Sequence, residues 1–117
     1  MVYADLGELE KAIWCYEQAL VISREIGNRL GESGALGNLG LVYANLGKPE
    51  KAIGFHEQQL AISREVVNRQ GEGIGLGNLG MNYALLGELE KAIRFYEQAL
   101  VTNPTFWSGQ LSCRPVN

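Results

Sequence analysis

The chain has 117 residues with 46% hydrophobic and 20% charged side chains, and its net charge of −3 comes from interleaved acids and bases. That balance excludes the basic patches that bind nucleic acid or anionic membranes, and no apolar run approaches the roughly 20 residues that span a bilayer. The N-terminus lacks a signal-peptide pattern and Cys15 and Cys113 lie far apart, so we expect a cytoplasmic protein without a disulfide framework.

A motif recurs every 40 residues along the chain. Its recurring positions include Tyr3, Tyr43 and Tyr83, then Gly7, Gly47 and Gly87, and a Lys-Ala-Ile triplet beginning at residues 11, 51 and 91. A fixed period of this length is typical of a solenoid, in which each unit buries its apolar face only by stacking on a neighbour.

Five helices are predicted within this repeat. Their expected ranges are 8–26, 31–46, 48–66, 71–86 and 88–102. In the range 31–46, Leu36, Leu39 and Tyr43 recur at helical spacing, and a glycine follows, which ends a helix by adopting positive φ. Pro49 suits the first turn of the next helix. Because the connections are short, successive helices must be antiparallel. We name the helices at 31–46 and 71–86 A helices, and the other three B helices.

The turns from a B helix to an A helix carry Gly27 and Val67 at the same repeat position. Since valine disfavours positive φ, we expect Asn28 and Asn68 to make the chain reversal instead and to cap the following helix. Two i,i+4 ion pairs are also expected, Glu25–Arg29 and Glu65–Arg69. Such pairs contribute only about 0.2–0.5 kcal/mol each.

Leu36, Leu39, Gly40, Tyr43 and Ala52 fall at the spacing of the tetratricopeptide repeat, as do their counterparts 40 residues later. The chain resembles the 40-residue variant of that repeat, which occurs in Pins-type spindle-orientation scaffolds, kinesin light chains and bacterial multi-repeat proteins. The resemblance implies an all-α, right-handed solenoid of antiparallel helix pairs with five to six helices. Gly40 against Ala52, and Gly80 against Ala92, would let two helix backbones approach closely. The implied units are a partial unit 1–27, then 28–67 and 68–104, giving a repeat domain 1–104 and a non-repeat tail 105–117.

The family resemblance also implies a scaffold module that binds a protein or peptide in a groove lined by the A helices. By position, the groove residues are Asn38, Asn78, Gly37, Gly77, Leu41, Met81, Asn45 and Leu85, with Gly34 and Ile74 beside them. Asparagine both donates and accepts hydrogen bonds, so Asn38 and Asn78 would hold an extended peptide backbone. The glycines would admit a ligand backbone or a neighbouring helix. Alternatively, the asparagines bond between repeats and the glycines serve only helix packing.

Other interpretations remain open. The chain could be the ligand-sensing part of a larger bacterial regulator, binding a peptide or small molecule, or a purely structural repeat segment. The clamp that some related domains use for acidic C-terminal peptides needs basic residues, and the corresponding positions here hold Gly37, Leu41, Gly77 and Met81.

No enzyme, metal or cofactor site is predicted. His56 is the only histidine and replaces a tyrosine found in the other units, so we expect it to pack within its helix rather than to act as a base or ligand. One histidine and two distant cysteines cannot supply the usual zinc ligands. The terminal B helices lack part of their cover, so the ends are expected to form a homo-oligomer, or to be covered by Phe106, Trp107 and Leu111.

Overall fold

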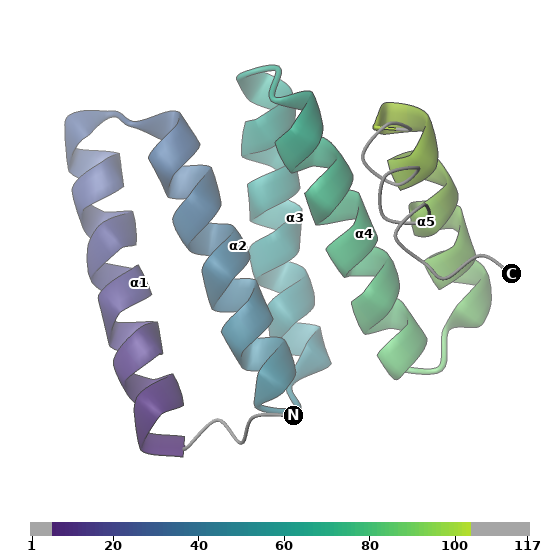
Figure 1. The fold of residues 1–117 in the computed structure, drawn as a ribbon, viewed down its shortest axis with the longest axis horizontal. Coiled ribbons are helices and arrows are strands. Elements are labelled where there is room, and N and C mark those ends of the chain that lie inside the picture. The colour runs from purple at the N-terminus through teal and green to yellow at the C-terminus, as the bar shows by residue number, and fades with distance from the viewer. Residues whose placement is uncertain (1–5, 104–117) are drawn as a thin grey trace, which may run out of the picture.

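The computed structural model describes residues 6–103, which form five α-helices joined by short turns (Figure 1). The helices are α1 Leu6–Ile26, α2 Arg29–Asn45, α3 Pro49–Glu65, α4 Arg69–Leu85 and α5 Leu89–Thr102. Every helix end lies within two residues of its expected position, so the all-α fold of sequential antiparallel pairs is confirmed. Within residues 6–103, no helix is both long enough and apolar enough to cross a membrane.

Each helix packs against the next one in the chain, and the two A helices, α2 and α4, also touch each other. In Figure 1 the B helix α3 lies behind and between α2 and α4. This arrangement follows from the short turns, which leave each helix only its immediate neighbours to cover its apolar face.

Two hydrophobic clusters make up the core, one around each A helix. The first includes Leu20, Leu36, Leu39 and Ile62, and the second includes Ile53, Leu60, Leu76, Leu79 and Ala99. The repeat extends to side-chain contacts. The ring of Tyr43 stacks on Phe55 with 5.4 Å between centroids, and Lys51 lies over the same tyrosine at 4.6 Å; Tyr83, Phe95 and Lys91 repeat this arrangement. The 40-residue period therefore reproduces packing as well as helix positions.

All four turns are Schellman motifs, and here one expectation was wrong. The residue with positive φ is Gly27 in the first turn, at +73°, and its counterpart Val67 in the third, at +57°. In both turns the following asparagine donates its backbone N–H to a serine carbonyl at 2.8 Å, which closes the motif. The hydrogen-bonded turn therefore imposes left-handed geometry on valine despite the steric cost.

Asn28 and Asn68 cap the following helices as expected, but they do not adopt left-handed geometry. Their φ angles are −85° and −98°, and each side chain accepts a hydrogen bond from the backbone N–H three residues later, that of Gly31 or Gly71. One asparagine thus closes a helix end and caps the next helix, which explains the very short connection.

The expected i,i+4 ion pairs are also wrong. Arg29 instead pairs with Glu32, at 2.8 Å, and with Glu65 at the far end of the same unit, where Nε to Oε2 is 3.1 Å. Glu32 is additionally bound by Arg24 from the preceding helix at 3.0 Å. These contacts join α1, α2 and α3 at one edge. The hydrogen bond from Arg24, followed by that from Arg29, lowers the pKa of the buried Glu32 carboxyl.

Candidate functional site

A hollow of about 290 Å³ lies between the N-terminal halves of the two A helices. Its lining residues come from α2, α3, α4 and the turn before α4: Leu30, Ser33, Gly34, Gln59, Asn68, Gln70, Gly71 and Ile74. Leu30 is exposed and Ile74 half-buried, whereas Ser33 and Gln59 are buried. The hollow therefore combines apolar walls with buried polar groups, a combination that suits a small apolar group with hydrogen-bonding neighbours. A larger depression, of about 400 Å³, lies on α5, and its lining within residues 6–103 comes from that one helix.

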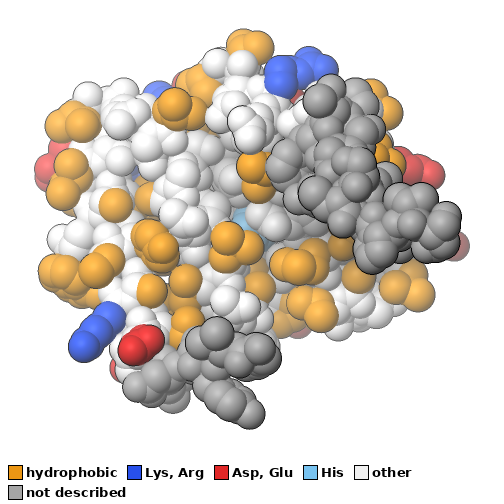
Figure 2. Space-filling view, viewed as in Figure 1, with side chains coloured by type: hydrophobic (Ala, Val, Ile, Leu, Met, Phe, Trp, Pro, Cys, Tyr) orange, Lys and Arg blue, Asp and Glu red, His pale blue; other side chains and the backbone are white. Residues whose placement is uncertain are grey.

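The groove residues expected from the sequence differ in exposure. They are exposed at Asn38, Leu41, Asn45 and Leu85, half-buried at Asn78 and Met81, and buried at Gly37 and Gly77. Figure 2 shows the face with α2 and α4 in front: hydrophobic and uncharged groups fill the visible central part, and charged side chains lie toward its margins. Such a surface offers little to a strongly charged ligand.

The buried glycines of α2 make room for two polar side chains of α3. A Cβ at Gly37 would lie 2.8 Å from Nε2 of Gln59, and a Cβ at Gly40 would lie 2.6 Å from the ring of His56. The close approach expected between Gly40 and Ala52 is thus mainly an approach to His56. At Gly80 a Cβ would lie 3.1 Å from the ring of Tyr96 and 3.2 Å from the backbone oxygen of Ala92, so the close approach expected between Gly80 and Ala92 is present.

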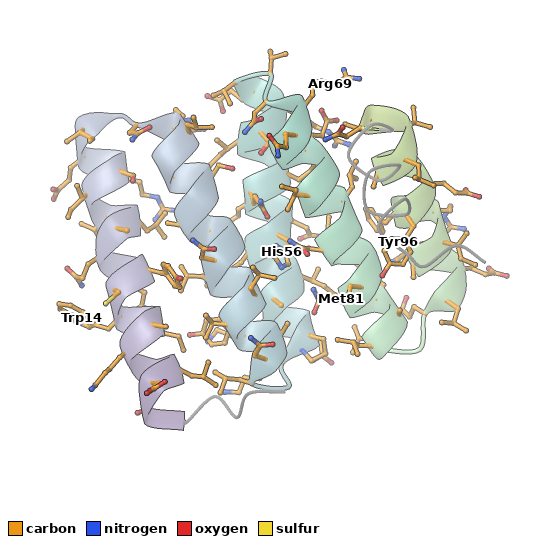
Figure 3. All side chains as sticks on the ribbon, in the orientation of Figure 1. Trp14, His56, Arg69, Met81 and Tyr96 are labelled. Atoms are coloured by element: carbon orange, nitrogen blue, oxygen red, sulfur yellow. The ribbon has the colours of Figure 1, made fainter. Side chains whose placement is uncertain are left out.

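His56 is fully buried, which confirms that it packs within its helix, and Figure 3 shows it among α2, α3 and α4. Its Nδ1 lies 3.0 Å from Oε1 of Gln59, and burial lowers its pKa. The neutral ring therefore donates from Nδ1 to the amide oxygen. Within residues 6–103, two side-chain atoms are buried without a hydrogen-bond partner: Nε2 of His56 and, on α4, Oδ1 of Asn82. The same residues contain no group of three or more His, Cys, Asp or Glu placed to hold a metal ion.

Gln59 is one of the lining residues that the sequence interpretation missed, together with Leu30, Ser33, Gln70 and Gly71. The apolar face of the helix that carries Gln59 was assigned to other residues, and a glutamine was not expected to be buried there. Its signal was a departure from the repeat, because the other two units hold Ala19 and Ala99 at that position.

The helices at both ends of the described array expose apolar side chains that the middle helix buries. Ile93 and Leu100 of α5 are 54% and 45% exposed, whereas their counterparts Ile53 and Leu60 are 8% and 7% exposed. On α1, Ile13 is only half-buried, and Trp14, whose counterpart in α3 is Gly54, is 62% exposed. In α3 the equivalent face is covered by α4.

Comparison with known proteins identifies these helix pairs. A family model described as tetratricopeptide repeat matches residues 1–65 and 32–100. The crystal structure of the TPR domain of Arabidopsis FLU superposes with a TM-score of 0.78 at 32% identity, covering 84% of this chain and 82% of that one. A search of curated proteins found no match. The family matches extend over most of the chain and agree with its helix pairing, so this chain belongs to the tetratricopeptide repeat family.

Proposed function

We propose that this chain is a protein-binding module that holds an extended peptide segment of its partner along α2 and α4. Tetratricopeptide domains are generally protein-interaction modules, and the two A helices carry the surface by which this chain would act. The observation that carries the proposal is the open hollow between them, continued along the helices by exposed Asn38 and half-buried Asn78.

Hydrogen bonding supports a role for these two asparagines. Among the described residues, neither side chain takes part in a hydrogen bond, although the backbone carbonyl of Asn78 accepts one from Asn82 at 2.8 Å. Their amides are therefore available to donate to and accept from a peptide backbone. The exposed Leu41 and Leu85 add apolar area next to them, which would supply affinity while the asparagines fix orientation.

A peptide-display selection on the immobilised protein tests this proposal. Selected peptides would be synthesised with a fluorophore, and their affinity for the parent chain and for the Asn38→Ala/Asn78→Ala variant measured by anisotropy. Loss of one or two hydrogen bonds predicts about a 5- to 50-fold weaker affinity, with unchanged helicity by circular dichroism.

The matched control is Gln18→Ala/Gln58→Ala, which removes two exposed amides, also 40 residues apart, from B helices. It should leave affinity unchanged. If both double variants bind the peptides as tightly as the parent chain, the A-helix surface is not the binding site. That result would favour the interpretation of the chain as a purely structural repeat segment.

A further inference from the structure

The middle unit departs from its neighbours at two positions one helical turn apart. Units one and three have tyrosine and alanine there, Tyr16 with Ala19 and Tyr96 with Ala99, whereas the middle unit has His56 and Gln59. Ala99 is fully buried in the second core cluster. The fold therefore accepts an alanine at the position of Gln59, and packing alone does not require the polar pair.

The two polar side chains are bonded to each other and held between helices. Oε1 of Gln59 accepts from Nδ1 of His56 at 3.0 Å, and the amide lies over Gly37 of α2, where a Cβ would stand 2.8 Å from its Nε2. On the other side, a Cβ at Gly75 of α4 would lie 3.8 Å from its Cδ. Gln59 is only 7% exposed, yet it lines the hollow.

The amide nitrogen of Gln59 is the group left over from this arrangement. Within residues 6–103, Nε2 has no hydrogen-bond partner, while the amide oxygen is already used by His56. Nε2 is not among the fully buried unpaired atoms of the described residues, so it is accessible, and a ligand acceptor in the hollow that Gln59 lines can take its hydrogen. With Oε1 placed against Nδ1 of His56, the amide nitrogen is the end that remains for a ligand.

The walls of the hollow indicate what would accompany that acceptor. Two of its lining side chains are apolar, Leu30 of α2 and Ile74 of α4. The hydroxyl of the buried Ser33 is already hydrogen-bonded to α3. Among the described residues, no acidic or basic side chain lines the hollow. The chemistry therefore suits a neutral carbonyl next to a medium-sized apolar group.

We propose that the Gln59 amide donates to a backbone carbonyl of a bound peptide whose aliphatic side chain lies between Leu30 and Ile74. This assignment rests on the proposed function, and it adds the ligand class and the anchoring residue. His56 acts as a positioning residue that holds the amide with its nitrogen toward the ligand. The sequence deviation of the middle unit is thus a recognition site in an otherwise repetitive surface.

N-acetyl-leucine N-methylamide is the probe for this site, because it presents one aliphatic side chain between two peptide groups. Titration into the ¹⁵N-labelled full chain, followed by NMR, should shift the Gln59 side-chain amide and the backbone amides of Leu30 and Ile74. A probe of this size is expected to bind with a dissociation constant on the order of millimolar. Absence of shifts at these three residues at saturating probe would overturn the assignment.

Gln59→Ala gives the middle unit the residue of its neighbours and is therefore expected to fold. It should weaken probe binding about 3- to 10-fold, the effect of losing one neutral hydrogen bond. Gln58→Ala removes an exposed amide from the adjacent position and should leave binding unchanged. Equal affinity of Gln59→Ala and the parent chain for the probe would refute the role of Gln59. That result is independent of the display peptides, whose response to Asn38 and Asn78 tests the wider groove.

The positioning role of His56 is tested by two substitutions. His56→Phe keeps an aromatic ring against Gly40 but removes the donor, so the amide loses its fixed orientation and probe affinity should fall. His56→Asn places a side-chain donor near the position of Nδ1 and should restore most of that affinity. If His56→Phe and His56→Asn weaken binding equally, the ring is only a packing residue.

Discussion

Replacing Val67 with glycine should stabilise the protein, an unusual result for a valine substitution. Val67 has φ of +57°, and it is the only non-glycine residue with positive φ in residues 6–103. Left-handed geometry costs an L-residue about 1–2 kcal/mol. Glycine avoids this cost, but its greater freedom in the unfolded chain offsets about 0.4–1 kcal/mol. Val67 is 75% exposed, so little burial is lost.

The net expectation is a gain of about 0.5–1 kcal/mol, which raises the melting temperature by roughly 2–5 °C. Urea and thermal unfolding followed by circular dichroism at the helix band measure both values. The reciprocal variant Gly27→Val places valine at φ of +73° in the equivalent turn and should destabilise by a similar amount.

Substituting the neighbouring valine distinguishes the effect of relieving positive φ from the effect that glycine has on stability at any position. Val66 precedes Val67 and has φ of −93°, which valine adopts without strain. Val66→Gly should therefore destabilise by about 0.5–1 kcal/mol. The reasoning fails if Val67→Gly is no more stable than the parent chain, or if both glycine variants shift stability in the same direction.

Three further predictions follow from packing, titration and the exposed ends. Gly40→Ala should destabilise the protein by about 1–3 kcal/mol because its Cβ would meet the buried His56 ring. Gly34→Ala should stabilise it by up to about 1 kcal/mol, since Gly34 is an exposed helical residue with open space around its Cβ position. Urea unfolding measures both changes. Burial lowers the folded-state pKa of His56 below its ordinary 6.5, so the unfolded chain binds the proton first and stability should fall as pH drops below 6.5, by at most about 1.4 kcal/mol per pH unit. In His56→Tyr, unfolding curves at a series of pH values should lose that slope, and an unchanged slope would assign it to other groups. The chain should self-associate at tens of micromolar through its terminal helices, and Ile93→Glu/Leu100→Glu should shift the sedimentation profile toward monomer; a parent chain that sediments as a stable monomer contradicts this.

The sequence was sufficient to predict the helices, because the signals that mark them act over a few residues. The leucines at 36 and 39 recur at helical spacing, and the glycines at 47 and 87 adopt the positive φ expected of them, +77° and +81°. The 40-residue period likewise predicted stacking, since a unit that exposes an apolar face needs a neighbour. The resemblance to the tetratricopeptide repeat implied that a ligand would bind the A-helix surface, which remains a proposal.

Tertiary structure alone decided the rest, because those features depend on residues far apart in the chain. Arg29 binds Glu65, 36 residues away, rather than Glu25, since folding brings the two ends of the unit together. Val67 becomes left-handed because hydrogen bonds across the whole turn outweigh the preference of one residue. The space above Gly37 is taken by Gln59 of the next helix, and only the packed helices leave a hollow beside it. Local sequence specifies where helices begin and end, whereas the contacts between them depend on how their surfaces fit.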